Sequence, residues 1–229
     1  MTILRPPRGL LLDLDGTLID SAPDLADALA VVLADQGCAP LEEPTVRRMV
    51  GNGVARLVET AFVQSGKRLT GERLERAISA MECEYGKRLT KRTALLAGAR
   101  ELVALCRAER IALACVTNKP RAMAQAILAH FGLDSAIEVV VGGDGDLPRK
   151  PAPEPLIAAM SALGLGRTDV WMVGDGLPDV KAARAAEITC CAVASEYGED
   201  FDAEREAMLV VSGLPALVRV IEHLSVVAD

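Results

Sequence analysis

The sequence predicts an α/β fold, a parallel sheet with helices on both faces into which a small helical block is inserted. Three observations predict it. Short apolar runs alternate with amphipathic segments over residues 98–225, as strand–helix–strand units require. Residues 41–92 contain no convincing strand and are rich in Arg, Glu and Lys at helical spacing. The first apolar run, residues 9–15, precedes this block, so the block interrupts the sheet after its first strand.

The first strand is expected over residues 9–15, GLLLDLD, where three leucines form a short apolar run. A helix is expected over residues 21–36, where apolar residues recur at helical spacing and Pro23 occupies the first turn. Asp20 or Ser21 can cap this helix. Further helices are expected near residues 43–50, 53–65, 71–90, 98–109, 120–131, 154–164, 178–186 and 214–225, and further strands at residues 111–116, 137–141, 169–173 and 188–194.

The predicted domains are a core of residues 1–20 and 93–229 and a helical cap of residues 21–92. The core should be aliphatic, because 51% of the residues are apolar and only 3% are aromatic. A net charge of −7 without a basic stripe argues against a nucleic-acid partner. No apolar run has the length of a membrane span, and the N-terminus does not have the pattern of a signal peptide. Six cysteines without a C-x-x-C pair fit a reducing compartment, so we expect a cytoplasmic protein.

Polar side chains follow the predicted strands at the point where each strand ends. In an open parallel sheet, ligands bind beyond the carboxyl ends of the strands. We therefore expect these side chains to meet at one edge, where they would gather four carboxylates, a hydroxyl and an amine. The carboxylates are those of Asp13, Asp15, Asp175 and Asp179, the hydroxyl is that of Thr117, and the amine is that of Lys150.

The charge of this group indicates a metal. Two unit charges about 5 Å apart interact by roughly 3 kcal/mol at an effective dielectric constant of about 20. Clustered carboxylates opposite a single lysine would need a compensating cation, and oxygen ligands without nearby His or Cys suit Mg²⁺. A bound metal would also allow a phosphate dianion to approach these acids. The sequence therefore predicts a magnesium site that accepts a small phosphorylated metabolite.

The order of these segments resembles the haloacid dehalogenase-like hydrolase superfamily. The matching motifs are DLDGT from Asp13, VTN ending at Asn118, Lys150 within RKPAPEP, and GDGLPD from Gly174. The resemblance covers nearly the whole chain, and it implies a Rossmann-like parallel sheet core with a small inserted α-helical cap domain. It also implies a Mg²⁺-dependent phosphatase that hydrolyses phosphomonoesters through an aspartyl-phosphate.

The resemblance assigns the chemical steps to particular residues. Asp13 would be the nucleophile, and Asp15 would protonate the leaving oxygen and then deprotonate water. Thr117 and the backbone N–H of Asn118 would hold phosphate oxygens. Lys150 would neutralise charge and orient Asp13.

The metal ligands follow from the same resemblance. Mg²⁺ would be held by the Asp13 carboxylate, the Asp15 backbone carbonyl and Asp175, and Asp179 would support these ligands from behind. Asp179 taken alone could instead favour the N-terminus of its own helix through the helix dipole.

Within the superfamily the sequence is most similar to phosphoglycolate phosphatases. The segments VGNGVARLV (50–58), VTNKP (116–120), VVVGGD (139–144) and EYGED (196–200) look like that group. Ala152 and Gly176 depart from the usual pattern, which bears on substrate more than on activity. Phosphoglycolate is therefore the first expected substrate. The alternatives are N-acetylmuramic acid 6-phosphate or another sugar phosphate, or phosphoryl transfer of the β-phosphoglucomutase type.

Candidate substrate-binding residues other than Asn118 lie next to the first motif and in the cap. Gly16 follows the two acids of the first motif, and the loop Gly51-Asn52-Gly53 could offer backbone N–H groups to an anion. Arg48, with Arg47 and Arg56 beside it, could clamp a substrate carboxylate. Taken singly, the loop is equally compatible with a plain turn, and each arginine with an ordinary surface position.

Two rival functions are disfavoured by the first motif. Haloalkanoate dehalogenases have a similar fold but lack the second carboxylate, which is Asp15 here. A signalling receiver module also surrounds an aspartate with acids, a threonine and a lysine, but its phosphorylated aspartate follows a middle strand. Here the middle strands end in Thr117 and Gly142, and the D-x-D spacing and inserted cap do not fit such a module.

Overall fold

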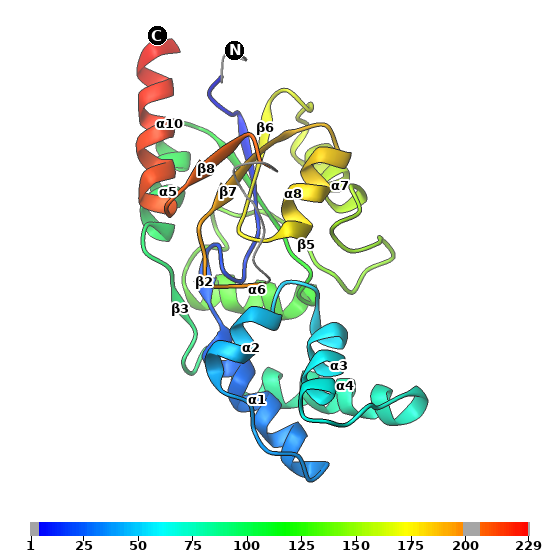
Figure 1. The fold of residues 1–229 in the computed structure, drawn as a ribbon. Helices are drawn as coiled ribbons and strands as arrows, with labels where there is room; N and C mark the ends of the chain where they lie inside the picture. Colours follow the sequence, from blue (N-terminus) through cyan, green and yellow to red (C-terminus); the bar gives the residue numbers. More distant parts are fainter. Residues whose placement is uncertain (1–4, 199–206, 229) are drawn as a thin grey trace.

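The predicted parallel sheet with helices on both faces is present (Figure 1). The computed structural model describes residues 5–198 and 207–228. Six strands pair in the order β5-β4-β1-β6-β7-β8, and every neighbouring pair is parallel. Their bounds are β1 Gly9–Leu12, β4 Ala112–Val116, β5 Val139–Val141, β6 Val170–Gly174, β7 Thr189–Val193 and β8 Leu209–Val211. All six carboxyl ends therefore lie along one edge of the sheet.

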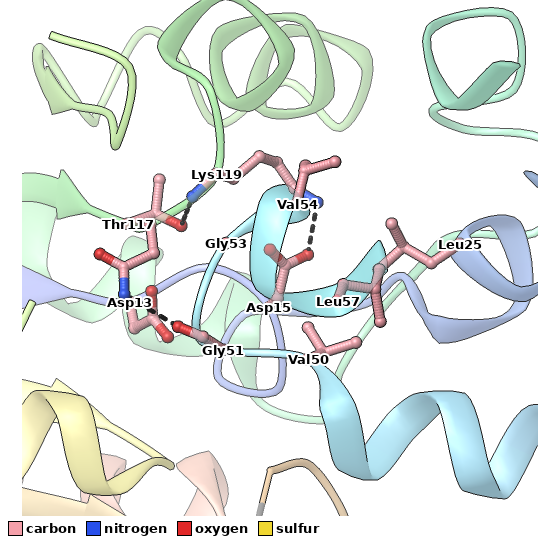
Figure 2. A pocket seen from close by; sticks show the side chains of 11 residues that line it. Asp13, Asp15, Leu25, Val50, Gly51, Gly53, Val54, Leu57, Thr117 and Lys119 are labelled. Carbon is pink, nitrogen blue, oxygen red and sulfur yellow. Dashed lines mark hydrogen bonds and ion pairs between the residues drawn. The ribbon is translucent and has the colours of Figure 1, made fainter. Parts of the chain in front are cut away.

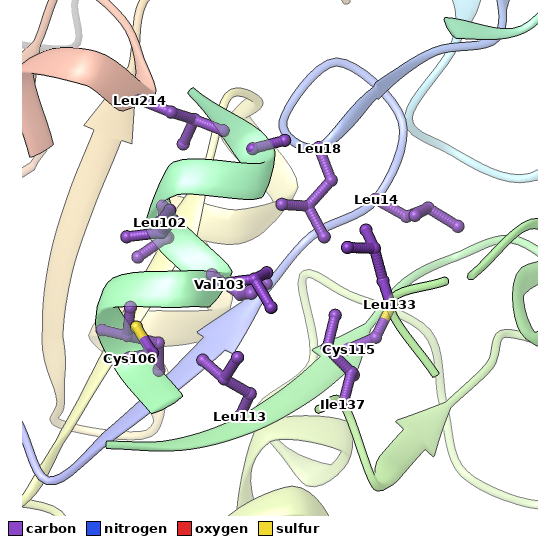
Figure 3. Packing of buried hydrophobic residues seen from close by; sticks show 14 of the residues in the cluster. Leu14, Leu18, Leu102, Val103, Cys106, Leu113, Cys115, Leu133, Ile137 and Leu214 are labelled. Atoms are coloured by element: carbon purple, nitrogen blue, oxygen red, sulfur yellow. The ribbon is translucent and has the colours of Figure 1, made fainter. Parts of the chain in front are cut away.

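The central strand β1 is buried on both faces because helices cover both sides of the sheet. Leu10 and Leu12 pack into one cluster with side chains of α5, α6 and α10, part of which is shown in Figure 3. Leu11 points to the other face and packs with side chains of α7 and α8. This alternation explains the uninterrupted apolar run, since a strand covered on both faces has no polar side. The bounds are α5 Ala99–Ala108, α6 Arg121–His130, α7 Glu154–Leu163, α8 Leu177–Ala185 and α10 Leu214–Ala228.

Four helices lie beyond the carboxyl edge of the sheet and form the inserted block (Figure 1). They are α1 Ala22–Asp35, α2 Glu43–Met49, α3 Val54–Gln64 and α4 Gly71–Gly86. Their apolar faces form a cluster separate from the two on the sheet, with Phe62, Met81 and Tyr85 fully buried in it. The fold class expected from the sequence is thus confirmed, whereas the exact domain boundaries at residues 20 and 93 stay predictions.

A short antiparallel pair, β2 (Ile19–Asp20) and β3 (Ala94–Leu95), connects the helices to the core. The sequence analysis did not predict it, because two residues carry no periodicity. The first strand also ends at Leu12, earlier than expected, since the chain turns at the two acids that follow.

The N-terminus of α1 is capped by Asp20 rather than Ser21. The N–H of Ala22 lies 3.3 Å from Asp20 Oδ1 and 2.8 Å from the Tyr197 hydroxyl. Ser21 stands at the cap position, but its hydroxyl donates to Asp15 Oδ1 instead. The side chain is therefore diverted from the helix to the candidate site.

None of the six cysteines forms a disulfide, and Cys106, Cys115, Cys190 and Cys191 are buried. Within residues 5–198 and 207–228, no helix is long and apolar enough to cross a bilayer.

The buried carboxylate of Asp24 in α1 fastens the cap to the returning chain. It accepts the N–H groups of Arg92, at 3.0 and 2.9 Å, and of Thr93, at 2.8 Å. The Thr93 hydroxyl donates to it as well, at 2.8 Å. Three donors in the segment that leads to β3 therefore depend on one side chain.

Asp24→Ala should lower the free energy of unfolding by about 3 kcal/mol, because it leaves buried donors without an acceptor. Urea denaturation measures this change. Asp27→Ala is the matched control: Asp27 is 44% exposed and pairs with Arg92 at 3.1 Å, so its loss should cost less than about 1 kcal/mol. Equal effects of the two substitutions would contradict the role given to Asp24.

Candidate active site

The sheet topology brings the predicted site residues together. Asp13 follows β1, Thr117 follows β4 and Asp175 follows β6, and β1 lies between the other two strands. The N–H of Asp13 donates to Val173 O at 2.9 Å, which fixes the chain where it leaves the sheet. The three side chains therefore emerge next to one another at the centre of the carboxyl edge.

Lys150 is the cation at the centre of this group. Its Nζ lies 2.8 Å from Asp13 Oδ1, 2.7 Å from Asp179 Oδ1 and 2.5 Å from the Val116 carbonyl oxygen. An ammonium has three protons to donate, so all three are directed to these partners. The side chain is only 2% exposed. Lys150 thus joins the residue after β1, the end of β4 and helix α8 in one buried polar network.

The acids around Lys150 form a compact cluster. Carboxylate oxygens of Asp13, Asp175 and Asp179 lie within 4.8 Å of one another, and all three residues are buried. Asp175 Oδ1 accepts the Thr17 hydroxyl at 2.9 Å, and Asp179 Oδ2 accepts the N–H of Gly176 at 3.0 Å. These bonds hold the acids in place although their charges repel.

Gly16 permits the chain after Asp15 to approach the Asp175 carboxylate closely. Its φ is +86°, and a Cβ at this position would overlap the Asp175 carboxylate. Residues with a side chain rarely adopt such a φ, so both the turn and the space require glycine. Gly16 therefore lies against the acidic cluster, while contact with substrate stays a prediction.

Burial dominates the electrostatics of the cluster. It raises the pKa of Asp13 from 3.8 to about 7, against the opposing effect of Lys150. Burial also raises the pKa of Asp175, with Asp13 and Asp179 adding to it. For Lys150, burial would lower the pKa, but Asp13 and Asp179 together raise it above its ordinary value. The lysine is therefore a fixed cation, whereas burial favours the protonated forms of Asp13 and Asp175 unless a further cation is bound.

These residues fit a hard divalent ion. The three clustered acids offer only oxygen atoms, at a mutual separation that one cation can span. A metal would supply the charge that Lys150 alone does not balance. The residues that could hold it by their side chains are Asp13, Asp175 and Asp179.

Asp15 faces the cap, away from that cluster. Its Oδ1 accepts the Ser21 hydroxyl and lies 2.8 Å from Lys119 Nζ. Lys119 in turn donates to the Tyr85 hydroxyl of α4 at 2.8 Å, and its Nζ lies 4.6 Å from the centre of the Tyr85 ring. The two acids of the first motif therefore have different partners, Lys150 for Asp13 and Lys119 for Asp15.

Two adjoining cavities open on these acids. The first, about 30 Å³, lies between Asp15 and the cap, and Figure 2 shows Asp15 and Lys119 pointing toward one another beside its apolar wall. The second, about 140 Å³, lies over the acidic cluster. Asp13 and Asp15 line both. The first is also lined by Leu25, Val50, Gly51, Gly53, Val54, Leu57, Thr117, Asn118 and Lys119, and the second by Val50, Gly51, Asn52, Pro151, Asp175, Gly176, Leu177, Pro178, Asp179, Lys181, Tyr197 and Gly198.

The residues of the loop Gly51-Asn52-Gly53 line the two cavities, while their contact with substrate stays a prediction. Gly51 lines both cavities, and its carbonyl oxygen accepts the Asn118 side-chain amide at 2.9 Å. Gly53 has a φ of +86° and precedes α3. The core and the cap thus meet across this loop.

Of the three arginines that could clamp a substrate carboxylate, Arg47 and Arg56 pair with acids of the chain. Arg48 is exposed and lines neither of the two cavities, so its contact with substrate stays a prediction. Arg47 pairs with Asp20 at 2.8 Å and Glu43 at 3.0 Å, and Arg56 with Glu59 at 2.7 Å.

Comparison with known proteins identifies the family. The model of the haloacid dehalogenase-like hydrolase family matches residues 10–193. The chain belongs to the haloacid dehalogenase-like hydrolases. It is 38% identical over 221 residues to the phosphoglycolate phosphatase (plasmid) of Cupriavidus necator, covering 94% of each chain. It is 35% identical over 201 residues to that of Nitrosococcus oceani, covering 86% of this chain and 89% of the relative.

Solved structures agree with this assignment. The crystal structure of a predicted phosphoglycolate phosphatase from Haemophilus somnus 129pt superimposes with a TM-score of 0.85 at 27% identity, over 96% of this chain and 99% of that chain. The expectation of a phosphatase of the haloacid dehalogenase-like family is confirmed by these relatives.

Lys119 and Tyr85 are the site residues that the sequence analysis missed. Lys119 stands inside the VTNKP segment, so its position after a strand was a usable indication, but no role was given to it. Tyr85 lies on the apolar face of α4, where it looks like an ordinary core residue. The last two residues of the EYGED segment, 199–200, lie outside the described residues.

Asp13 should make the metal-free phosphatase less stable as the pH rises. Its pKa is 3.8 in the unfolded chain and about 7 when folded, so the folded state binds the proton more tightly between these values. The contribution to stability is present below pH 3.8 and is lost as the pH rises through about 7, by about 4 kcal/mol. Urea denaturation in EDTA between pH 4.5 and 8 should show Asp13→Asn gaining stability relative to wild type as the pH increases.

The surface substitution Asp134→Asn is the control and should follow wild type at every pH, because Asp134 is exposed. A stability difference between wild type and Asp13→Asn that stays constant with pH would contradict the raised pKa of Asp13.

Proposed function

We propose that this protein is a Mg²⁺-dependent phosphomonoester hydrolase that acts through an aspartyl-phosphate on Asp13, with phosphoglycolate as its substrate. One observation carries the proposal. Lys150 holds Asp13 and Asp179 at 2.8 and 2.7 Å, inside a buried acidic cluster that adjoins an open cavity. A carboxylate fixed by a neighbouring cation and open to a cavity is arranged to attack an electrophile.

Asp13 is the nucleophile in this proposal. Lys150 holds Oδ1, so the orientation of the carboxylate is set before substrate arrives. One carboxylate oxygen attacks phosphorus, the ester oxygen leaves, and the phosphoryl group is joined to Asp13. Lys150 also places a positive charge beside the phosphoryl oxygens as that group is transferred.

Thr117 and Asn118 hold the phosphoryl oxygens. The Thr117 hydroxyl oxygen accepts the N–H of Lys119 at 3.2 Å, so its own proton is left to donate elsewhere. The Asn118 side chain is occupied by the carbonyl oxygens of Gly51 and Lys150, at 2.9 and 3.0 Å. The backbone N–H of Asn118 is thereby held in place as the second donor.

Asp15 moves the protons. Both of its side-chain contacts with the described residues, from Ser21 and Lys119, are made at Oδ1, which leaves Oδ2 for proton transfer. Asp15 lines the same cavities as Asp13, so it borders the space that the leaving oxygen would occupy. It protonates that oxygen, and it then takes a proton from the water that hydrolyses the aspartyl-phosphate.

Mg²⁺ would be held by Asp13 and Asp175 and by the backbone carbonyl of Asp15, with Asp179 supporting them through Lys150 and Gly176. When bound, it would supply a Lewis acid that offsets the charge of the acids and of the phosphate. Six unpaired cysteines, four of them buried, fit a reducing compartment, and we propose a cytoplasmic location.

The size of the cavity on the cap side supports a small substrate. A volume of about 30 Å³ corresponds to roughly two water molecules. Its cap side is formed by the apolar residues Leu25, Val54 and Leu57, which offer no hydrogen bonds to sugar hydroxyls. A two-carbon acid fits such a chamber better than a hexose. The curated relatives named phosphoglycolate phosphatase support the same choice.

The purified protein should hydrolyse p-nitrophenyl phosphate with Mg²⁺, and EDTA should abolish this activity. Asp13→Asn should remove turnover, because no covalent intermediate forms. Asp15→Asn should lower kcat by roughly 100- to 10,000-fold, the range that general acid–base catalysis contributes. Phosphate release and circular dichroism measure activity and fold.

The exposed Asp134→Asn is the matched control and should retain wild-type activity. A fully active Asp13→Asn variant would refute the nucleophile, and unchanged rates in Asp15→Asn would refute the acid–base role.

Phosphoglycolate should give the highest kcat/KM in a phosphate-release screen of phosphometabolites. The small apolar chamber should reject larger leaving groups, so N-acetylmuramic acid 6-phosphate and hexose phosphates should react at least about 100-fold more slowly. The screen should include β-glucose 1-phosphate with detection of glucose 6-phosphate. A higher kcat/KM for any sugar phosphate, or mutase turnover, would overturn phosphoglycolate as the substrate.

A further inference from the structure

We propose that Lys119 determines substrate specificity by binding the carboxylate of the acid phosphate on the side of the site remote from phosphorus. The inference rests on the proposed function, because it needs a substrate with a second anionic group. Its starting point is the placement of Lys119. This side chain is 4% exposed, extends from the end of β4 and lines the cavity between Asp15 and the cap.

The cavity is suited to the carbon end of the substrate. Asp13 and Thr117 line it on the core side, and Leu25 and Leu57 of the cap line the opposite side (Figure 2). Asp15 and Lys119 face one another beside that apolar wall. With phosphorus at Asp13, the leaving group of the ester therefore extends past Asp15 toward Lys119.

Lys119 is the cation available there. Among the described residues that line this cavity, Lys119 alone carries a positive charge. The cap arginines do not compete, because Arg47 and Arg56 are paired with acids outside the cavity and Arg48 is exposed. A carboxylate left in an apolar chamber without a cation would be strongly destabilised. The anion would therefore be neutralised by Lys119.

The donors of the two buried lysines show which one can take a new ligand. Lys150 directs its three protons to Asp13, Asp179 and Val116. The contacts of Lys119 Nζ with the described residues are two, Asp15 Oδ1 and the Tyr85 hydroxyl. One N–H of its ammonium group is thus left for an oxygen in the cavity.

An ammonium shared by two carboxylates already exists in this site. Lys150 Nζ bridges Asp13 and Asp179 at 2.8 and 2.7 Å while almost fully buried. Lys119 would bridge Asp15 and the substrate carboxylate in the same manner. The start of α3, at Val54, lies on the same cavity and adds the positive end of a helix dipole. The Lys119 ammonium and the N-terminus of α3 both favour an anion over a neutral group of equal size.

The test compares phosphoglycolate with ethyl phosphate, in which a methyl group replaces the carboxylate. Wild type should prefer phosphoglycolate, and Lys119→Met should lower that preference in kcat/KM by about 30-fold or more, the size of a lost charge-assisted hydrogen bond. Lys119→Arg, which keeps the charge, should retain part of the preference. Lys91→Met is the matched control: Lys91 is exposed and lines neither of the two cavities, so its loss should change the ratio by less than about threefold.

Binding separates recognition of the carboxylate from any effect of Lys119 on Asp15. In an Asp13→Asn background with Mg²⁺, calorimetry should show that Lys119→Met lowers the affinity for phosphoglycolate by about 30-fold. The affinity for ethyl phosphate should fall by less than about threefold. Thermal unfolding followed by circular dichroism checks that the variants are folded.

The possible results distinguish the two proposals. If Lys119→Met lowers kcat/KM for both esters equally and leaves the ratio of their affinities unchanged, Lys119 acts only through Asp15, and the inference is overturned while the proposed function stands. If wild type hydrolyses both esters but does not distinguish them, phosphoglycolate is overturned as the substrate, and the role of Lys119 with it. Loss of the preference in Lys119→Met and its retention in Lys91→Met support both proposals.

Discussion

The contact of Lys150 with Asp13 and Asp179 is the interaction on which the site depends. It lies between the ends of β1, β4 and β6, and it holds two acids of like charge in one buried space. Without this cation, burial and mutual repulsion would protonate the acids or push them apart. With it, a carboxylate at the end of the central strand is fixed in orientation and remains open to a cavity. Burial still favours the protonated forms of Asp13 and Asp175, and a divalent metal would stabilise their charged forms.

In the function proposed here, the two lysines divide the site into a phosphate side and a carbon side. Lys150 belongs to the core and meets the acids around Asp13, whereas Lys119 meets Asp15 and reaches Tyr85 in the cap. The core alone can therefore arrange the chemistry of phosphoryl transfer. The cap supplies the apolar wall and the small volume that select what is attached to the phosphate. In this division, the reaction depends on the sheet, and the substrate depends on how the cap helices lie over it.

Much of this organisation could be predicted from the sequence. The alternation of apolar runs with helical segments predicted the sheet, because its central strands are covered on both faces and read as continuous apolar runs. The residues that follow these runs predicted Asp13, Thr117 and Asp175 as site residues. The short strands β2 and β3 were not predicted, because two residues are too few to show a periodic pattern of apolar side chains. Asp20 or Ser21 was expected as a helix cap; Asp20 accepts the N–H of Ala22, and the Ser21 hydroxyl donates to Asp15. At Ser21, the hydrogen bond to the buried carboxylate of Asp15 replaces the helix-capping role that serine commonly has.

The sequence by itself determined the parallel sheet, the inserted helices and the set of acids and lysines at the carboxyl edge. The spacing of apolar residues predicts the helices and strands, and their order along the chain predicts which residues follow each strand. Only the tertiary structure decided which lysine pairs with which acid. It also brought Tyr85 to Lys119 and paired Arg47 with Asp20. Such pairings join residues far apart in the chain, and they depend on the geometry of packed elements, which no local pattern encodes.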